Sequence, residues 1–183
     1  MARRIAYTGA PVLTLEQVAF QCNAEPEDLQ TELIDHIIIP GVTAQGESKT
    51  GAAIREAIYE EDWPAGYPSG HSLDVGQVVT IESIHILGDA GSPVPFSGPV
   101  ELILGGKESY LEFPAGRPAG RLRIRYRACV DLEAHPGVLS WLLMAAETAF
   151  THRGQLVVGQ SLAEIPSSFV DHLLADITIP PRF

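Results

Sequence analysis

The six histidines are the residues best suited to bind a metal or to transfer protons near neutral pH: His36, His71, His85, His135, His152 and His172. No two of them have the HExxH spacing that places two imidazoles on one helical face. Asp35-His36 and Asp171-His172 are sequence neighbours, and adjacent residues on a helix point apart. Cys22 and Cys129 lack the CxxC pairs of zinc sites. The pattern predicts no metal site and no cofactor; a site assembled from distant segments is the alternative.

Three short motifs resemble catalytic or phosphate-binding signatures but lack essential residues. Ser69-Gly70-His71 is not the GxSxG turn that exposes a nucleophilic serine, and Ser161 stands in no nucleophile motif. Gly105-Gly106-Lys107 lacks the first glycine of a phosphate loop and the hydroxyl residue after lysine, so a hairpin turn explains it better. Glu60-Glu61-Asp62 is interpreted as the solvated end of a strand rather than as an acid–base cluster. We therefore predict no catalytic residues and no enzymatic activity.

The most specific physical feature is a row of arginines in a stretch without acidic residues. Four of them alternate with Leu122, Ile124 and Tyr126, so that a strand places all four on one face: Arg121, Arg123, Arg125 and Arg127. Such a row repels itself unless it meets carboxylates or phosphates. Three kinds of partner are open: acids of a neighbouring strand such as Glu82, Glu101 or Glu112, acids of another subunit, or a nucleic-acid backbone.

Composition narrows the class of protein. The 183 residues are 45% hydrophobic and 19% charged, which suits one globular domain with a sizeable core. The net charge of -11 argues against a general grip on duplex DNA, and 11 acidic against 4 basic residues stand within positions 1–62. No apolar run approaches the length of a membrane span, so we expect no membrane partner. Two cysteines form no disulfide framework, which indicates free thiols and a reducing compartment.

Helical patterns frame the chain. Thr14 with Gln17 forms a capping box, which predicts a short helix to about Asn23. A second helix is predicted from Glu25-Pro26-Glu27-Asp28 onward, and Pro40-Gly41 either ends it or kinks it on its way to Thr50. Two more helices are predicted over 138–152 and 168–176.

Between the helices, β-branched and alternating segments predict short strands. They cover residues 55–62, 77–87, 100–104, 110–113 and 121–130, separated by turns rich in Gly and Pro. The predicted fold class is α+β: a mainly helical core with an inserted antiparallel β-domain of about four or five strands. We divide the single domain, 1–183, into N-terminal helices (11–53), a β-rich insert (54–130), C-terminal helices (136–176) and an extended tail (177–183). The apolar tail is either tucked against its own core or held by a partner.

The order of these segments resembles the head–tail connector (adaptor, or head-completion) proteins of tailed phages. The similarity begins at Pro11-Val12-Leu13-Thr14-Leu15-Glu16-Gln17-Val18 and continues through Leu33-Ile34, Thr50-Gly51-Ala52-Ala53-Ile54 and the strand Val78 to Ile84. It is strongest from Arg153 to Leu174, at Val157-Val158-Gly159, Glu164-Ile165-Pro166 and Leu173-Leu174. It covers about residues 11 to 176. Pro40-Gly41, Gly154 and the long loop from Trp63 to Gly76 depart from the family's pattern.

The resemblance implies a structural virion protein at the neck of the particle, assembled in the host cytoplasm. Its copies would form a closed ring, commonly dodecameric, beneath the portal protein, with a stopper or tail terminator protein on the tail side. The portal-docking tail would comprise Ile177, Ile179, Pro180, Pro181 and Phe183. The subunit interface would use Arg121, Arg123, Arg125, Arg127 and Arg153. The tail-facing loops would be those at Gly88, Asp89 and Gly91 and at Gly105, Gly106 and Lys107.

The acidity then has a role, because a DNA conduit should repel phosphates weakly so that the duplex slides through without specific binding. The acids expected to flank the channel are Glu25, Glu27, Asp28, Glu32 and Asp35. Two other functions stay open. One is a monomeric intracellular module whose β-domain binds a ligand or a partner, and the other is a hydrolase with scattered His and Asp residues. Neither the ring's copy number nor the choice between a phage and a gene-transfer particle follows from the sequence.

Overall fold

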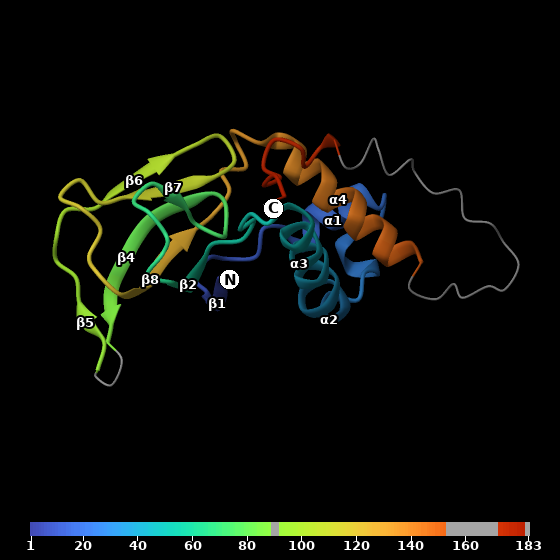
Figure 1. Ribbon diagram of the computed structural model, residues 1–183. Helices are drawn as coiled ribbons and strands as arrows, with labels where there is room; N and C mark the ends of the chain where they lie inside the picture. The colour runs from blue at the N-terminus through green and yellow to red at the C-terminus, as the bar shows by residue number, and fades with distance from the viewer. Residues whose placement is uncertain (89–91, 153–171, 182–183) are drawn as a thin grey trace, which may run out of the picture. The chain divides into compact units, whose positions relative to one another are not determined.

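The computed structural model describes residues 1–88, 92–152 and 172–181, which form two compact units (Figure 1). The sheet unit comprises Met1–Ala10, Gly51–Val130 and Ile177–Phe183. The helical unit comprises Pro11–Thr50 and Asp131–Asp176. The sheet unit thus collects both ends of the chain around the β-rich insert, and the two units are described separately below.

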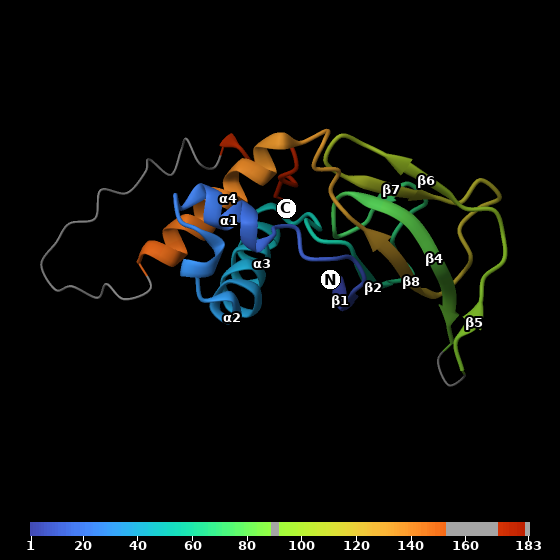
Figure 2. The same ribbon diagram turned by 180° about the vertical axis from the view of Figure 1, so that it is seen from behind.

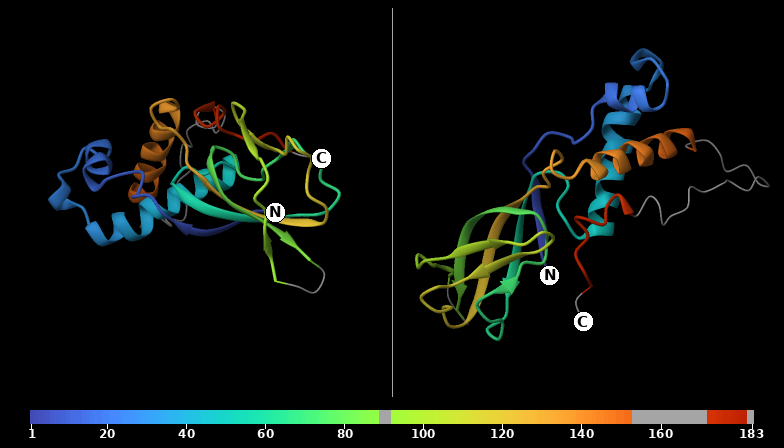
Figure 3. Two further views of the ribbon diagram at one scale, coloured as in Figure 1. Left: turned by 90° about the vertical axis from the view of Figure 1, so that its left-hand side faces the viewer. Right: turned by 90° about the horizontal axis from the view of Figure 1, so that it is seen from above.

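The sheet unit contains two antiparallel sheets (Figures 1 and 2). The larger has the order β1-β2-β8-β4-β5, with β1 at Arg3–Tyr7, β2 at Ala57–Trp63, β8 at Arg121–Ala128, β4 at Val78–Leu87 and β5 at Val94–Pro95. The smaller has the order β3-β7-β6, with β3 at His71–Ser72, β7 at Ser109–Glu112 and β6 at Glu101–Leu104. Figure 3 shows the same strands from two further directions.

Alternation along the central strands builds the core between the sheets. In β8 every second residue is buried, namely Leu122, Ile124, Tyr126 and Ala128, and β2 alternates in the same way. Leu111 of β7 belongs to the same buried cluster, so the smaller sheet covers the apolar face of the larger one. The opposite face of β8 carries the arginines. Period two in the sequence therefore separates a core face from a charged face.

The helical unit follows the predicted N-terminal pattern. Helix α1, Leu15–Gln21, is capped by Thr14 in the predicted capping box with Gln17. After a 3-10 turn η1 (Pro26–Asp28), a continuous helical stretch comprises α2 (Thr31–Leu33), the π-helical η2 (Ile34–Ile38) and α3 (Ile39–Thr50). Helix α4 spans Pro136–Thr151, and Gln21 of α1 donates to Glu147 of α4 at 2.7 Å.

Pro40 does not end the second helix, which continues to Thr50. The π-helical turn at Ile34–Ile38 lies directly before the proline-containing α3. Proline lacks the N–H of a regular helical turn and its ring crowds the preceding turn. A wider turn is one of the ways in which a helix absorbs this. Of the two alternatives that the sequence left open, the helix continues past Pro40, and the π-helical η2 marks the place.

The α+β class is confirmed, whereas the prediction of a mainly helical core is wrong. The strands form two sheets instead of one, and Arg3–Tyr7, for which no strand was predicted, adds β1 to the larger sheet. That segment has no apolar alternation because it is the terminal strand and is mostly exposed. Of the predicted helix 168–176, the first residues lie outside the described ones, and the rest forms a turn in which Ala175 N donates to His172 O at 3.2 Å.

Candidate functional site

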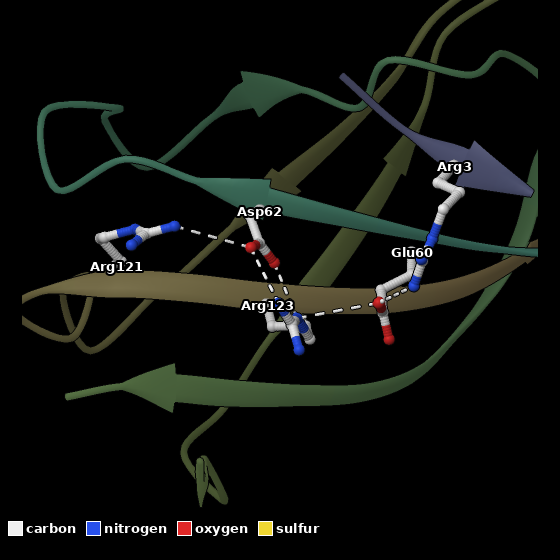
Figure 4. A network of polar contacts seen from close by, with 5 residues as sticks. All are labelled: Arg3, Glu60, Asp62, Arg121 and Arg123. Carbon is white, nitrogen blue, oxygen red and sulfur yellow. Dashed lines mark hydrogen bonds and ion pairs between the residues drawn. The ribbon is translucent and has the colours of Figure 1, made fainter. Parts of the chain in front are cut away.

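The charged face of the larger sheet is an ordered network of ion pairs (Figure 4). Arg123 makes a two-pronged contact with Asp62 on the adjacent β2, with Nε to Oδ1 at 2.8 Å and the second prong at 3.0 Å. Arg121 lies 3.6 Å from the same carboxylate, and Glu60 bridges Arg123 at 3.8 Å and Arg3 at 3.1 Å. Arg123 lowers the pKa of Asp62, chiefly by its hydrogen bond. Opposite charges on paired strands thus offset the repulsion within the row.

The other end of the row is paired across both neighbouring strands. Arg127 donates to Glu82 of β4 at 2.9 Å and lies 3.6 Å from Glu56. Among the expected acids of neighbouring strands, Glu82 is the one used, because Glu101 and Glu112 belong to the smaller sheet. Arg125 differs. Within the described residues, no carboxylate lies within 4.0 Å of it, and its buried Nε has no hydrogen-bond partner.

The Arg123–Asp62 contact yields a direct prediction. Replacing Arg123 with Ala should lower the free energy of unfolding by about 1 kcal/mol, because a two-pronged, partly shielded pair exceeds an ordinary surface pair. Arg121→Ala is the matched control, since Arg121 is more exposed and its pair with the same carboxylate is longer. It should cost no more than about 0.3 kcal/mol. Urea unfolding measures both, and equal losses for the two variants would contradict this account of the pair.

Glu61 corrects the interpretation of Glu60-Glu61-Asp62 as a solvated strand end. Its neighbours on β2 face the arginines, but Glu61 points into the core and is 2% exposed. Its carboxylate accepts hydrogen bonds from the Trp63 indole, from Tyr126 Oη at 2.9 Å and from Asp74 N at 3.0 Å. Burial raises the pKa of Glu61, and the charge of Asp74 raises it further. Alternation on a central strand, more than polarity, decides where this side chain lies.

The described part of the C-terminal tail packs against the sheet unit. Ile177 is fully buried and Ile179 half-buried, whereas Pro180 and Pro181 are exposed. A Cβ at either Gly51 or Gly76 would lie 3.2 Å from Ile179 Cδ1, so these two glycines form the floor under that side chain. Ile177, one of the expected docking residues, is thus buried within the chain's own core. Phe183 lies outside the described residues.

The expected channel acids belong to the helical unit. They lie at the N-cap of η1 and within η1, α2 and the start of η2. Four of them are exposed, namely Glu25, Glu27, Asp28 and Glu32, and Asp35 is half-buried. Glu32 lies 3.7 Å from His36. The structure brings them together along one short segment, and their role as channel acids stays a prediction.

The expected tail-facing loops lie at strand ends of the sheet unit. Gly88 follows β4 and is exposed, while Asp89 and Gly91 fall outside the described residues. Gly105, Gly106 and Lys107 form the turn between β6 and β7, closed by Gly105 N donating to Glu108 O at 2.8 Å. The hairpin interpretation of this glycine pair is confirmed. Arg153, the fifth expected interface residue, also falls outside the described ones.

The described part of the chain has neither a cluster of metal-binding side chains nor a helix that could span a membrane. Residues 1–88, 92–152 and 172–181 hold no group of three or more His, Cys, Asp or Glu side chains arranged to bind a metal ion. In the same residues, no helix is both long and apolar enough to cross a membrane. His71 instead contacts two aromatic rings, with ring centroids 3.9 Å from Tyr67 and 5.2 Å from Trp63.

Solved particle structures contain chains of the same fold at low sequence identity. One is a chain in the neck of an empty gene transfer agent (GTA) particle computed with C6 symmetry, with a TM-score of 0.76 and 15% identity. Another, in the virion of a native GTA particle, has a TM-score of 0.76 and 17% identity. A third, in the neck of a native GTA particle computed with C12 symmetry, has a TM-score of 0.66 and 14% identity. Each match covers 100% of this chain and 97% of the other.

No family model and no curated protein matches the sequence. At identities of 14 to 17% the likeness concerns the fold. The shared fold with chains of GTA neck and virion structures agrees with the resemblance predicted from the order of the sequence motifs.

Proposed function

We propose that this protein is a structural, non-enzymatic component of a virion neck, acting as a ring-forming adaptor between head and tail. The observation that carries the proposal is the full-length likeness of its fold to chains in GTA neck and virion structures. The order of the sequence motifs is a second observation in its support. Fold alone does not imply function, so the order of the motifs adds support that the fold does not supply.

The proposed assembly is a closed ring of copies, twelve in number. Two of the similar neck structures were computed with C6 and C12 symmetry. A ring closes through heterologous contacts, in which two different surfaces of each copy meet. On this chain, the arginine row is the proposed contact surface. Arg121, Arg123 and Arg127 already pair within the chain, so Arg125 is the member best placed to meet a carboxylate of the next copy.

The proposed portal contact is the exposed end of the tail. Because Ile177 and Ile179 are seated in the sheet unit, they would anchor the tail, while the segment from Pro180 to Phe183 would reach the portal protein. The acids of η1, α2 and η2 would flank a channel through which DNA passes without specific binding. The loops after β4 and between β6 and β7 would face a stopper or tail terminator protein.

Removal of the last four residues, 180–183, tests the portal contact. The truncated protein should retain its unfolding midpoint, because Ile177 and Ile179 stay in their seats, and it should no longer join portal rings. Docking is measured by negative-stain electron microscopy of the protein mixed with the portal of the same particle. Gly106→Ala serves as the control, since a Cβ there meets nothing within 4 Å. A truncated protein that still decorates portal rings would show that residues 180–183 are not the portal contact.

A further inference from the structure

A groove of about 560 Å³ lies between β4 and β6 in the sheet unit, and both polar and apolar side chains line it. One wall is formed by the consecutive β4 residues from Val79 to Ile84, and Phe96 lines the groove as well. The other wall consists of Val100, Leu102 and Leu104. Val79 is 57% and Leu104 65% exposed, which is unusual for large apolar side chains gathered at one place.

The β4 wall is a backbone edge. Successive side chains of a strand point to opposite faces, and six consecutive residues line this groove because the strand's edge faces it and the register shifts around Val79 and Glu82 interrupt the alternation. The other edge of β4 pairs with β8 between Val78 and Leu87, with register shifts between Val78 and Thr80 and between Ile81 and Ser83. On the groove side β5 pairs only at His85 and Ile86, and Phe96 N donates to Ile84 O at 2.9 Å. Among the described residues, no strand pairs with positions 79–83 on this side.

The chain leaves this edge open because it turns away after Phe96. The Phe96 ring packs against Phe113 with centroids 5.7 Å apart, and any side chain at Gly98 would collide with that ring. β5 is therefore limited to Val94–Pro95, and the chain crosses to β6 instead. The result is a row of backbone N–H and C=O groups beside an apolar wall.

The β6 wall presents a regular set of apolar side chains. Val100, Leu102 and Leu104 are alternate residues and so share one face of the segment. A strand added along β4 would direct every second side chain toward this wall. Its remaining side chains would join the charged face, near Thr80 and Ser83, whose register partners on β8 are Arg127 and Arg125.

The charges near β4 determine which side chains an added strand can place on the charged face of the sheet. Arg127 is paired with Glu82, whereas Arg125, opposite Ser83, has no carboxylate within 4.0 Å among the described residues. A strand placed beside β4 lies about 10 Å from β8, because two strand spacings separate them. An arginine and a carboxylate side chain together span this distance. The groove therefore favours an acidic residue between apolar ones.

We propose that the groove between β4 and β6 binds an extended segment of a partner protein by strand addition to residues 79–83 of β4. The guest segment has about five residues, roughly 17 Å in length, with apolar side chains at alternate positions and a carboxylate between them directed at Arg125. Main-chain hydrogen bonds provide the pairing, and the Val100–Leu102–Leu104 wall selects the apolar side chains. This inference rests on the open edge of β4, the Val100–Leu102–Leu104 wall and Arg125, and not on the proposed neck function. The guest carboxylate would compete with a neighbouring copy for Arg125.

The probe is a capped hexapeptide in which valine alternates with threonine and one glutamate. Titrated into the full-length protein, it should shift and protect the backbone amides of residues 79–83 in NMR spectra. Methylating alternate peptide nitrogens removes the main-chain donors and should abolish binding. Replacing the glutamate with lysine, or Arg125 with Gln in the protein, should weaken binding about threefold to tenfold.

Leu104→Asp and Ile103→Asp form a matched pair of protein variants. Both residues are exposed on β6, but only Leu104 lines the groove. Leu104→Asp should weaken the peptide about tenfold and Ile103→Asp by no more than about twofold. Equal effects of the two substitutions, or equal binding of the methylated peptide, would overturn the proposal. So would self-association of the protein that Leu104→Asp abolishes while the peptide fails to bind, because the groove would then belong to a second copy.

Discussion

Replacing Glu61 with Ala is expected to lower the free energy of unfolding of the sheet unit by about 3 kcal/mol. The variant leaves the Trp63 indole N–H, the Tyr126 hydroxyl and the Asp74 backbone N–H without the acceptor they share. A buried donor without a partner costs about 1 to 3 kcal/mol, and partial hydration of the vacated space reduces the sum. Urea unfolding followed by tryptophan fluorescence measures the loss directly, because Trp63 is one of the donors.

Glu61→Gln separates the hydrogen bonds of this side chain from its charge. The carboxamide oxygen can accept from Tyr126 and Asp74 N as one carboxylate oxygen does, whereas the NH2 group then faces the Trp63 N–H. The free energy of unfolding of Glu61→Gln should therefore fall by about 1 to 2 kcal/mol at pH 4. Burial raises the pKa of Glu61 above its ordinary value of 4.5 in the folded state. The folded protein then holds a proton that the unfolded chain releases, so this group's contribution is present below pH 4.5 and is lost as pH rises through the raised pKa.

The two proteins should therefore differ in their dependence on pH. The wild type should lose stability relative to Glu61→Gln as pH rises from about 4.5 toward neutrality. Asp62 acts in the opposite direction in both proteins, because its lowered pKa adds stability that is lost only as pH falls below its ordinary value of 3.8. A stability difference between wild type and Glu61→Gln that stays constant from pH 4 to 8 would refute the burial account of Glu61.

Gly76→Ala is expected to destabilise the sheet unit by about 2 to 3 kcal/mol and to loosen the seat of the tail. A Cβ at this position would lie 2.6 Å from the backbone oxygen of Lys107 and 3.2 Å from Ile179 Cδ1. A backbone atom cannot rotate away as a side chain can, so the β6–β7 turn must shift. The backbone N–H of Gly76 also donates to Gly51 O at 3.1 Å, and a shift of Gly76 would strain this hydrogen bond as well.

Gly106→Ala is the matched control for Gly76→Ala. It lies in the β6–β7 turn, and neither glycine is among those with positive φ. A Cβ at Gly106 meets nothing within 4 Å. The free energy of unfolding of the Gly106→Ala variant should differ from that of the wild type by less than about 0.5 kcal/mol. Amide hydrogen exchange at Ile177 and Ile179 reports the tail, and it should accelerate only in Gly76→Ala. Equal tolerance of Ala at both glycines would show that the close approach at Gly76 is not limiting.

Local patterns in the sequence determined the elements and the faces of this protein. The Thr14–Gln17 capping box and the alternation of Arg121 to Arg127 act between residues one to four positions apart, and the structure has both as expected. The order of short motifs also predicted the resemblance to connector proteins, and the full-length likeness in fold to a chain of a GTA neck agrees with it, although no family model matches the sequence.

Pairing between distant segments was decided only by the tertiary structure. Which acids meet the arginines depends on β2 and β4 flanking β8, and Glu61 is buried because a central strand must place every second residue in the core. β1, the second sheet and the seat of Ile177 and Ile179 likewise require contacts across the whole sheet unit. Local periodicity sets the direction of a side chain, but its partner is set by long-range packing, which no short segment encodes.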